Sequence, residues 1–225
     1  MIKIRRGLDL PISGNPEQII NDAPKARSVA IIGLDYHGMK PTMAVKEGDR
    51  VKLGQLLFTD KTTEGVLYTA PASGTVANIN RGARRVLQSV VIDVKGDDAV
   101  EFKCYKPEEI PGLNAASIIE TLAESGQWSA FRTRPYSKVP ATNTTASAIF
   151  VNAMDTNPLA ADPKVVIASQ VEAFSLGLML LTKLTEGDVY VCKAVDADLS
   201  VPNNPKIKVE TFAGLHPAGN SGTHI

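Results

Sequence analysis

Residues 45–92 constrain the fold of this chain more strongly than any other stretch. Apolar and polar residues alternate there in runs of four to eight, and turn residues such as Gly48-Asp49 and Arg81-Gly82 separate the runs. Glycine recurs where a tight hairpin needs a positive φ, which other residues adopt only with strain. Short strands joined by tight turns predict a small, flattened β-barrel.

The expected barrel strands include Val29 to Leu34, Val51 to Leu53 and Gln55 to Asp60. Such a barrel resembles the barrel-sandwich fold of biotinyl and lipoyl domains. That resemblance leaves two interpretations open: either Lys61 is a modified carrier lysine, or the barrel is a structural module of a larger protein.

Lys61 follows Asp60, as the carrier lysine follows an aspartate in lipoyl domains. A carrier lysine must sit at the tip of a tight, symmetric hairpin. Here the run from Gln55 to Asp60 is too short, and the run from Thr62 to Pro71 is too long. Because a one-residue slip inverts every strand face, this hairpin presents its tip differently. We therefore interpret Lys61 as a solvated lysine, and a stand-alone carrier domain is the alternative function.

The chain has 225 residues, which suits one large or two medium-sized domains. Lysine plus arginine and aspartate plus glutamate number 24 each, so no overall field attracts nucleic acid. Arg81, Arg84 and Arg85 form a local cluster without interleaved aromatic residues. We interpret this cluster as a solvated loop and expect no nucleic-acid partner.

Two cysteines, Cys104 and Cys192, are too few for a thiolate-held iron–sulfur cluster or a cysteine-based zinc site. We expect both to be buried free thiols in a reducing cytoplasm. The N-terminal residues lack the apolar core of a signal peptide. The most apolar run, 173–182, is about half the roughly 20 residues that a membrane span needs, so we expect no crossing.

The sequence predicts three parts: an irregular segment over 1–28, the barrel over 29–100 and an α/β domain over 101–225. Prolines and a glycine interrupt the first part. In the third part, Asn114 is a helix N-cap and Gly126 a helix stop.

The α/β pattern follows a long polar connection over 128–147. Ser147 to Ala153 is a near-continuous apolar run, typical of a strand buried on both faces. Asp162-Pro163 begins a helix that is expected to reach about Leu184, and Val189 to Cys192 is the next strand. Strand, helix and strand in this order predict a parallel, Rossmann-like unit.

The loop from Met154 to Pro163 is where a ligand would bind in such a sheet. It contains no glycine, whereas a dinucleotide site needs glycines for close approach to the pyrophosphate. We therefore expect neither NAD nor flavin there. Asp155 could serve as a catalytic carboxylate, but its Asp-Thr-Asn-Pro setting favours a turn-forming role.

No catalytic or metal-binding constellation emerges from the histidines. His37, His216 and His224 show no paired spacing, and no Ser-His-Asp or Cys-His arrangement is evident. The last two lie in a glycine-rich tail over 214–225, which could cradle an anion only if a helix followed it. The sequence predicts no catalytic, cofactor-binding or metal residue.

Two segments are candidates for contact with partner proteins, 128–145 and the tail. Aromatic and arginine side chains dominate interface energetics, although a loop packed within its own domain is the alternative for the first segment. The residues expected at such an interface are Trp128, Phe131, Arg132, Arg134, Tyr136, His216 and His224.

The whole chain resembles the NqrA subunit of the bacterial sodium-translocating NADH:quinone oxidoreductase. The resemblance rests on Ile2 to Ile12, on Gly33 to Pro41, on the barrel strands from Glu47 to Gln55, and on 216–225. Members of that family are about twice this long, so the chain resembles their N-terminal half and its α/β domain is expected to be truncated.

The resemblance implies a peripheral, non-catalytic subunit of a complex that oxidises NADH, reduces ubiquinone and pumps sodium ions. It implies a barrel module followed by a Rossmann-like domain, on the cytoplasmic face of the inner membrane. Flavins and iron–sulfur centres are then expected on other subunits. The chain is expected to meet the membrane only through those subunits. A role in ubiquinone binding or in assembly of the complex is also implied.

Overall fold

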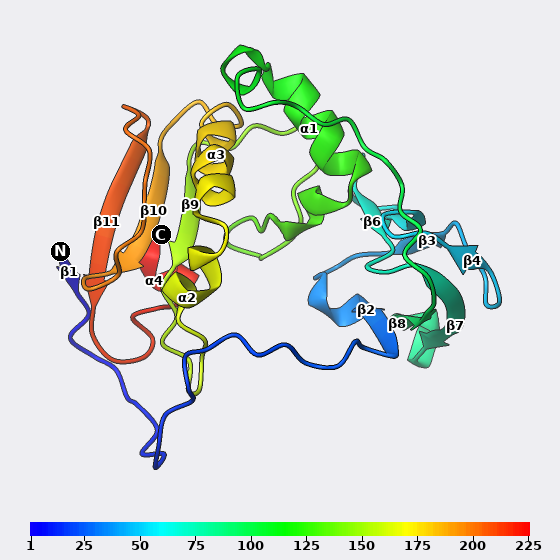
Figure 1. Ribbon diagram of the computed structural model, residues 1–225, viewed down its shortest axis with the longest axis horizontal. Coiled ribbons are helices and arrows are strands. Elements are labelled where there is room, and N and C mark those ends of the chain that lie inside the picture. Colours follow the sequence, from blue (N-terminus) through cyan, green and yellow to red (C-terminus); the bar gives the residue numbers. More distant parts are fainter. The chain divides into compact units, whose positions relative to one another are not determined.

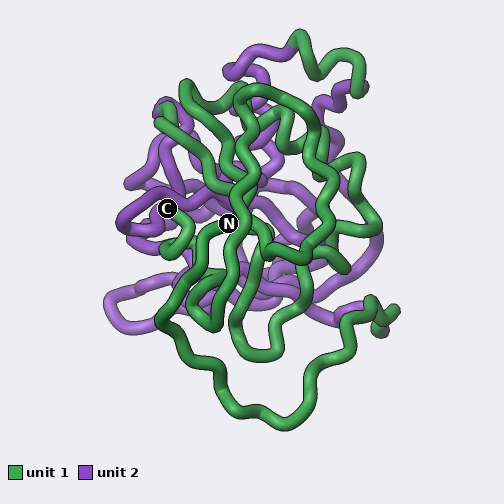
Figure 2. Tube along the Cα trace, turned by 90° about the vertical axis from the view of Figure 1, so that its left-hand side faces the viewer, with its two compact units in different colours: residues 1–23, 107–112, 145–225 green, residues 24–106, 113–144 purple.

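The computed structural model describes all residues, Met1–Ile225, and divides them into two compact units (Figure 2). Unit 1 comprises Met1–Ala23, Pro107–Gly112 and Thr145–Ile225, and unit 2 comprises Pro24–Lys106 and Leu113–Thr144. The two largest differences from the predicted boundaries are at residues 1–23 and 113–144. The first residues join the α/β unit because they add a strand to its sheet. Residues 113–144 join the barrel because they pack on its strands.

Unit 2 is built from two antiparallel sheets (Figure 1). One sheet has the order β2-β8-β7-β4 and the other the order β3-β5-β6. The strands are β2 (Ser28–Ile32), β3 (Pro41–Met43), β4 (Arg50–Val51), β5 (Leu56–Asp60), β6 (Leu67–Thr69), β7 (Gly74–Arg81) and β8 (Leu87–Val94). They confirm the expected succession of short strands, with β2 and β4 ending earlier than predicted.

Glycine serves the barrel in two ways, only one of which was predicted. Gly48 and Gly54 have φ of 88° and 80°, as tight turns require. At Gly82, in the turn predicted at Arg81-Gly82, φ is −90° and the expectation of a positive φ is wrong. Gly74 has no positive φ either. Gly74 is required by space instead, since a Cβ there would lie 2.0 Å from the carbonyl oxygen of Asp93.

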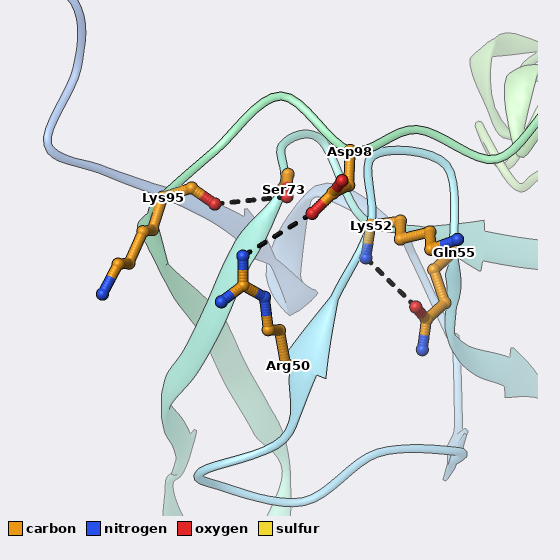
Figure 3. A network of polar contacts seen from close by, with 6 residues as sticks. All are labelled: Arg50, Lys52, Gln55, Ser73, Lys95 and Asp98. Atoms are coloured by element: carbon orange, nitrogen blue, oxygen red, sulfur yellow. Dashed lines mark hydrogen bonds and ion pairs between the residues drawn. The ribbon is translucent and has the colours of Figure 1, made fainter.

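After β8 the chain returns over the barrel and is fastened by polar contacts (Figure 3). The Ser73 hydroxyl donates to the Lys95 carbonyl at 3.3 Å, and Arg50 pairs with Asp98 at 3.5 Å. Because both members of that ion pair are well exposed, its contribution to stability is small. The backbone bond from Leu53 N–H to the Asp98 carbonyl at 2.9 Å is the firmer link.

Unit 2 also contains the helical segment that follows the return. Helix α1 (Ala115–Glu124) has Asn114 as N-cap, whose side chain accepts from the Ser117 N–H at 2.8 Å. It ends at Gly126, which has a left-handed φ of 77°. Both predictions are confirmed. The short helix η4 (Gln127–Ala130) follows directly, so the predicted irregular connection begins with a helical turn. The other short helices are η1 (Gly33–Asp35), η2 (Ala83–Arg85) and, in unit 1, η3 (Ile110–Gly112).

Unit 1 is a four-stranded parallel sheet in the order β1-β11-β10-β9. Its strands are β1 (Ile2–Lys3), β9 (Ile149–Ala153), β10 (Val189–Ala194) and β11 (Ile207–Ala213). The parallel pairing of β9 with β10 confirms the predicted strand-helix-strand unit. The expectation that 1–28 is irregular fails at β1, which pairs Ile2 with Phe212.

The helix predicted from Pro163 to Leu184 is in fact two helices, α2 (Pro163–Ala168) and α3 (Val171–Leu181). Asp162 caps α2 as expected, accepting from the Lys164 N–H at 2.9 Å. The break falls at Gln170, whose φ of −138° is not helical. It follows a β-branched run, 165–167, which disfavours helix.

Helix α3 and the sheet share one core. Leu178 packs with Val189, Val191 and Ile207, and Phe174 joins them. Strand β9 is less buried than predicted, because it lies at the edge of the sheet and its Asn152 is exposed. The opposite face carries a second cluster of Met154, Cys192, Phe212 and Ala218, so the tail of the chain covers the face that α3 leaves open.

Two glycines, one within α3 and one shortly after it, should respond oppositely to substitution by alanine. At Gly187 a Cβ would lie 2.0 Å from the Ser147 carbonyl oxygen, so Gly187→Ala should destabilise unit 1 by about 1–3 kcal/mol. At Gly177, inside α3, nothing lies within 4 Å of an added Cβ, so Gly177→Ala should stabilise unit 1 by about 1 kcal/mol.

Thermal unfolding followed by circular dichroism measures both changes. Fluorescence of Trp128, the single tryptophan, reports on unit 2 and should show an unchanged transition. Equal effects of the two substitutions would contradict the close approach at Gly187.

Candidate functional site

Unit 2 contains a cavity of about 660 Å³ between the barrel strands and the segment from α1 to η4. That volume is in the range of small-molecule sites, roughly 300–1,000 Å³. Its walls are both apolar and polar, and include Ile32, Tyr36, Tyr68, Phe102, Gly126 and Gln127. The sequence analysis did not predict this cavity, because its residues come from widely separated stretches of the chain.

Aromatic rings build one wall of the cavity. Tyr68 in β6 stacks on Phe58 in β5, with ring centroids 4.6 Å apart and planes at 16°. Tyr36 meets Tyr68 edge to face at 4.7 Å. The guanidinium of Arg132 lies 5.2 Å from the centre of the Tyr36 ring, a cation–π contact. The two tyrosine rings therefore support each other, and Phe58 and Arg132 support them from outside.

The Tyr68 hydroxyl is buried and has no hydrogen-bond partner. The side chain is 2% exposed, so this polar atom is removed from water without compensation. Burial, together with the nearby Asp60 carboxylate, raises the pKa of Tyr68 well above its ordinary value. The hydroxyl therefore keeps its proton and remains an unpaired donor on a residue that lines the cavity.

Two close contacts shape the remaining walls. Phe102 lies over Gly54, where a Cβ would be 2.8 Å from its ring, so the returning chain brings an aromatic ring to the cavity. The Thr69 hydroxyl donates to the Ser125 carbonyl at 3.1 Å, which ties β6 to the end of α1. At Gly126 a Cβ would lie 2.3 Å from that same hydroxyl, so the helix end sits directly on the strand.

The residues predicted for an interface are only partly exposed. Trp128 is 5% exposed and its indole N–H donates to the Pro140 carbonyl at 2.8 Å, so it packs inside unit 2. Phe131 meets it edge to face at 5.0 Å. Arg134 and Tyr136 are exposed, Tyr136 to 71%. For Trp128 the packed-loop alternative is the better description, and for the exposed residues the interface stays a prediction.

In unit 1, the tail closes the carboxyl edge of the sheet, where nucleotides bind in related architectures. The Gly219 N–H donates to the Thr156 hydroxyl at 2.8 Å, and the Asn152 amide donates to the Gly219 carbonyl at 2.9 Å. A Cβ at Gly219 would lie 2.4 Å from the Thr156 nitrogen. The His216 ring nitrogen Nδ1 lies 3.1 Å from the Thr156 carbonyl oxygen. The chain itself fills this position.

The second predicted tail residue, His224, belongs to α4 (Ser221–His224) and is buried. Its ring lies 4.0 Å from the Phe212 ring, and its Nε2 is 2.7 Å from the Ala218 carbonyl oxygen. That contact makes Nε2 the donor and leaves Nδ1 as a buried acceptor without a partner. Burial lowers the pKa of His224, although the Ala218 carbonyl opposes this in part.

The remaining candidates have structural roles. Asp155 accepts from the Asn157 N–H at 2.8 Å, which confirms the turn-forming interpretation. Cys192 is buried as expected, but the expectation for Cys104 is wrong: it is exposed.

No group of three or more metal-ligating side chains is present, and no helix is long and apolar enough to span a bilayer.

Lys61 lies at the start of the β5–β6 turn rather than at its centre. The Lys61 side chain is exposed, and the backbone N–H of Lys61 donates to the Lys40 carbonyl at 2.9 Å. The preceding Asp60 accepts from the Lys40 and Thr62 N–H groups, each at 2.9 Å. These bonds outweigh the effect of burial and lower the pKa of Asp60, so an ionised carboxylate fixes the turn.

Lys61 should be unmodified in the cell. The off-centre turn position does not present it as a swinging arm, so the intact mass should equal that of the unmodified polypeptide. Mass spectrometry of the chain from its native host is the measurement. A lipoyl or biotinyl increment on Lys61 would reverse this interpretation.

Unit 1 should lose stability as the pH falls below about 6.5. The buried His224 resists protonation, whereas the same side chain in the unfolded chain accepts a proton near its ordinary pKa of 6.5. The unfolded state then binds more protons, so the free energy of unfolding decreases as the pH falls from 7 towards the lowered pKa.

Urea unfolding at pH 7 and pH 5 measures this effect. Replacement of His224 by glutamine removes the titrating ring, so the pH dependence of the variant should be shallower. Parallel pH profiles for the two proteins would show that His224 does not contribute.

Comparison with known proteins covers the whole chain. Residues 2–95 match the family described as the NqrA N-terminal barrel-sandwich hybrid domain, and residues 113–225 match the NqrA second alpha/beta domain. These matches confirm the predicted fold classes and their order.

The chain is 60% identical over 225 residues to the A subunit of the Na(+)-translocating NADH-quinone reductase of Saccharophagus degradans and to that of Cellvibrio japonicus. The corresponding subunit of Neisseria meningitidis serogroup B is 55% identical. Each match covers 100% of this chain and 50% of the relative, so the chain spans about half the length of these curated relatives. With two matching domains and this identity throughout, the chain belongs to the NqrA family of the Na(+)-translocating NADH-quinone reductases.

Proposed function

We propose that this chain is part of a peripheral subunit, without a cofactor of its own, in a complex that oxidises NADH, reduces ubiquinone and pumps sodium ions. Family membership and the names of the relatives support the complex. The filled carboxyl edge of unit 1 supports the absence of a nucleotide in this chain, because Gly219 and His216 take the place that a pyrophosphate would need.

The partners in this proposal are the other subunits of the complex, which carry the flavins and iron–sulfur centres. The chain lies on the cytoplasmic face of the inner membrane and meets the membrane only through those subunits. The exposed side chains of Arg134 and Tyr136 are suited to such contacts, since arginine and tyrosine are enriched at the centres of interfaces.

The cavity of unit 2 binds the headgroup of ubiquinone in this proposal. The observation that carries it is the buried, unpartnered hydroxyl of Tyr68. A quinone is a planar ring with carbonyl acceptors, so it matches an aromatic wall that ends in a fixed donor. Bound quinone would accept a hydrogen bond from Tyr68, which the protein alone leaves unpaired.

Replacing Tyr68 by phenylalanine should weaken the binding of a short-chain ubiquinone by about ten-fold. The variant keeps the stack on Phe58 and loses only the donor, whose bond is worth about 1 kcal/mol or somewhat more. Titration calorimetry with the 225-residue chain is the measurement. The thermal midpoint should stay the same or rise, since a buried unpartnered hydroxyl has been removed.

Tyr136→Phe is the matched control. It makes the same chemical change in unit 2 at a residue that is 71% exposed, and it should leave the affinity unaltered. Equal affinities for all three proteins would remove the support for a quinone in this cavity.

A further inference from the structure

The β7–β8 hairpin of unit 2 ends in a tip with three arginines and no acidic residue. Residues 74–92 contain no aspartate or glutamate. Arg81, Arg84 and Arg85 are all exposed, and none forms an ion pair in the structure. The tip therefore concentrates positive charge in a chain whose formal net charge is zero. Like charges held this close repel one another.

The backbone of the tip adopts a conformation that arginine disfavours. Arg84 and Arg85 have φ of 55° and 61°, in the left-handed region where glycine or asparagine is usual in a hairpin. The conformation is held by several hydrogen bonds within the tip. The Arg81 guanidinium donates to the Arg85 carbonyl at 3.0 Å, and the Gly82 N–H donates to the Val86 carbonyl at 2.8 Å. Backbone strain of this kind clusters at functional sites.

Exposed apolar side chains lie at the same end of the sheet. Strand β2 runs antiparallel to β8, so the residues after Ile32 meet the start of β8. The approach is close, because a Cβ at Gly33 would lie 2.2 Å from the Leu87 carbonyl oxygen. Around this contact, Ile32, Leu34 and Val86 are 40%, 75% and 52% exposed.

We propose that the hairpin patch, defined as Ile32, Leu34, Arg84, Arg85 and Val86, docks an acidic, amphipathic segment of another protein subunit. Guanidinium groups bind carboxylates through two parallel hydrogen bonds, and the apolar side chains supply the desolvated centre of an interface. Guanidinium groups bind carboxylates and phosphates with the same bidentate geometry, so the exposed apolar side chains beside the arginines are what favour a protein segment. This inference rests on the proposed function as one subunit in a complex.

The test uses the whole gene product that contains this chain, added to membranes from cells that lack it. Arg84→Glu with Arg85→Glu should reduce retention on these membranes at least about ten-fold, since two favourable charge pairs become repulsive. The control is Lys25→Glu with Arg27→Glu, which makes the same change in charge at the opposite end of the same sheet, next to the Ser28–Asp93 pair. It should be retained like the unaltered protein.

A second variant separates docking from folding. Arg84→Gly with Arg85→Gly relieves the left-handed strain, so the thermal midpoint of Trp128 fluorescence should rise by several degrees while retention is lost. A lower midpoint would contradict the inferred strain, and unaltered retention of the glutamate variant would contradict the docking proposal.

Liposomes containing phosphatidylglycerol identify the kind of partner. If the unaltered protein binds them and the glutamate variant does not, the hairpin patch binds anionic lipid and the proposal of a protein partner is wrong. If the unaltered protein is not retained on the membranes at all, the proposed function fails together with this inference.

Discussion

The carboxyl edge of the parallel sheet depends on Thr156. Its hydroxyl accepts from the Gly219 N–H, its carbonyl contacts the His216 ring, and its own nitrogen would lie only 2.4 Å from a Cβ on Gly219. Residues 60 or more positions apart are thereby fixed to one another. This edge is where open parallel sheets bind nucleotides, so the contact that stabilises the fold lies at the position that a nucleotide would take. The α/β unit keeps the architecture of a nucleotide-binding domain and uses its edge for packing.

Unit 2 concentrates its unusual chemistry around one side chain. Tyr68 is stacked on Phe58, met edge-on by Tyr36 and left without a hydrogen-bond partner. An apolar residue of the same shape would avoid the cost of that unpaired hydroxyl, roughly 1–3 kcal/mol. A buried polar group retained without an internal partner is explained if its partner is a ligand. The proposed ligand site therefore lies in the barrel unit rather than in the Rossmann-like unit.

Local signals predicted local structure well. The Asn114 cap, the Gly126 stop and the Asp162-Pro163 helix start are confirmed, because each depends on neighbours within four residues. The strand β1 was missed because two residues pair only with the distant β11. The cavity was missed for the same reason: Tyr36, Tyr68 and Phe102 carry no common spacing in the sequence. The apolar-polar alternation around Tyr68 could have indicated that its side chain points inward, but not what it meets there.

The cavity and the hairpin patch share Ile32, which lines the one and belongs to the other. Helix η1 continues from it to Asp35 and Tyr36, both at the cavity. A partner seated on the hairpin patch would therefore press on the segment that carries the Tyr36 ring, which contacts Tyr68 at 4.7 Å. If docking and ligand binding each favour the same position of this segment, each must strengthen the other by the same factor, because coupling free energies are reciprocal. The proposed docking surface and the proposed ligand cavity thus share one short segment, residues 32–36.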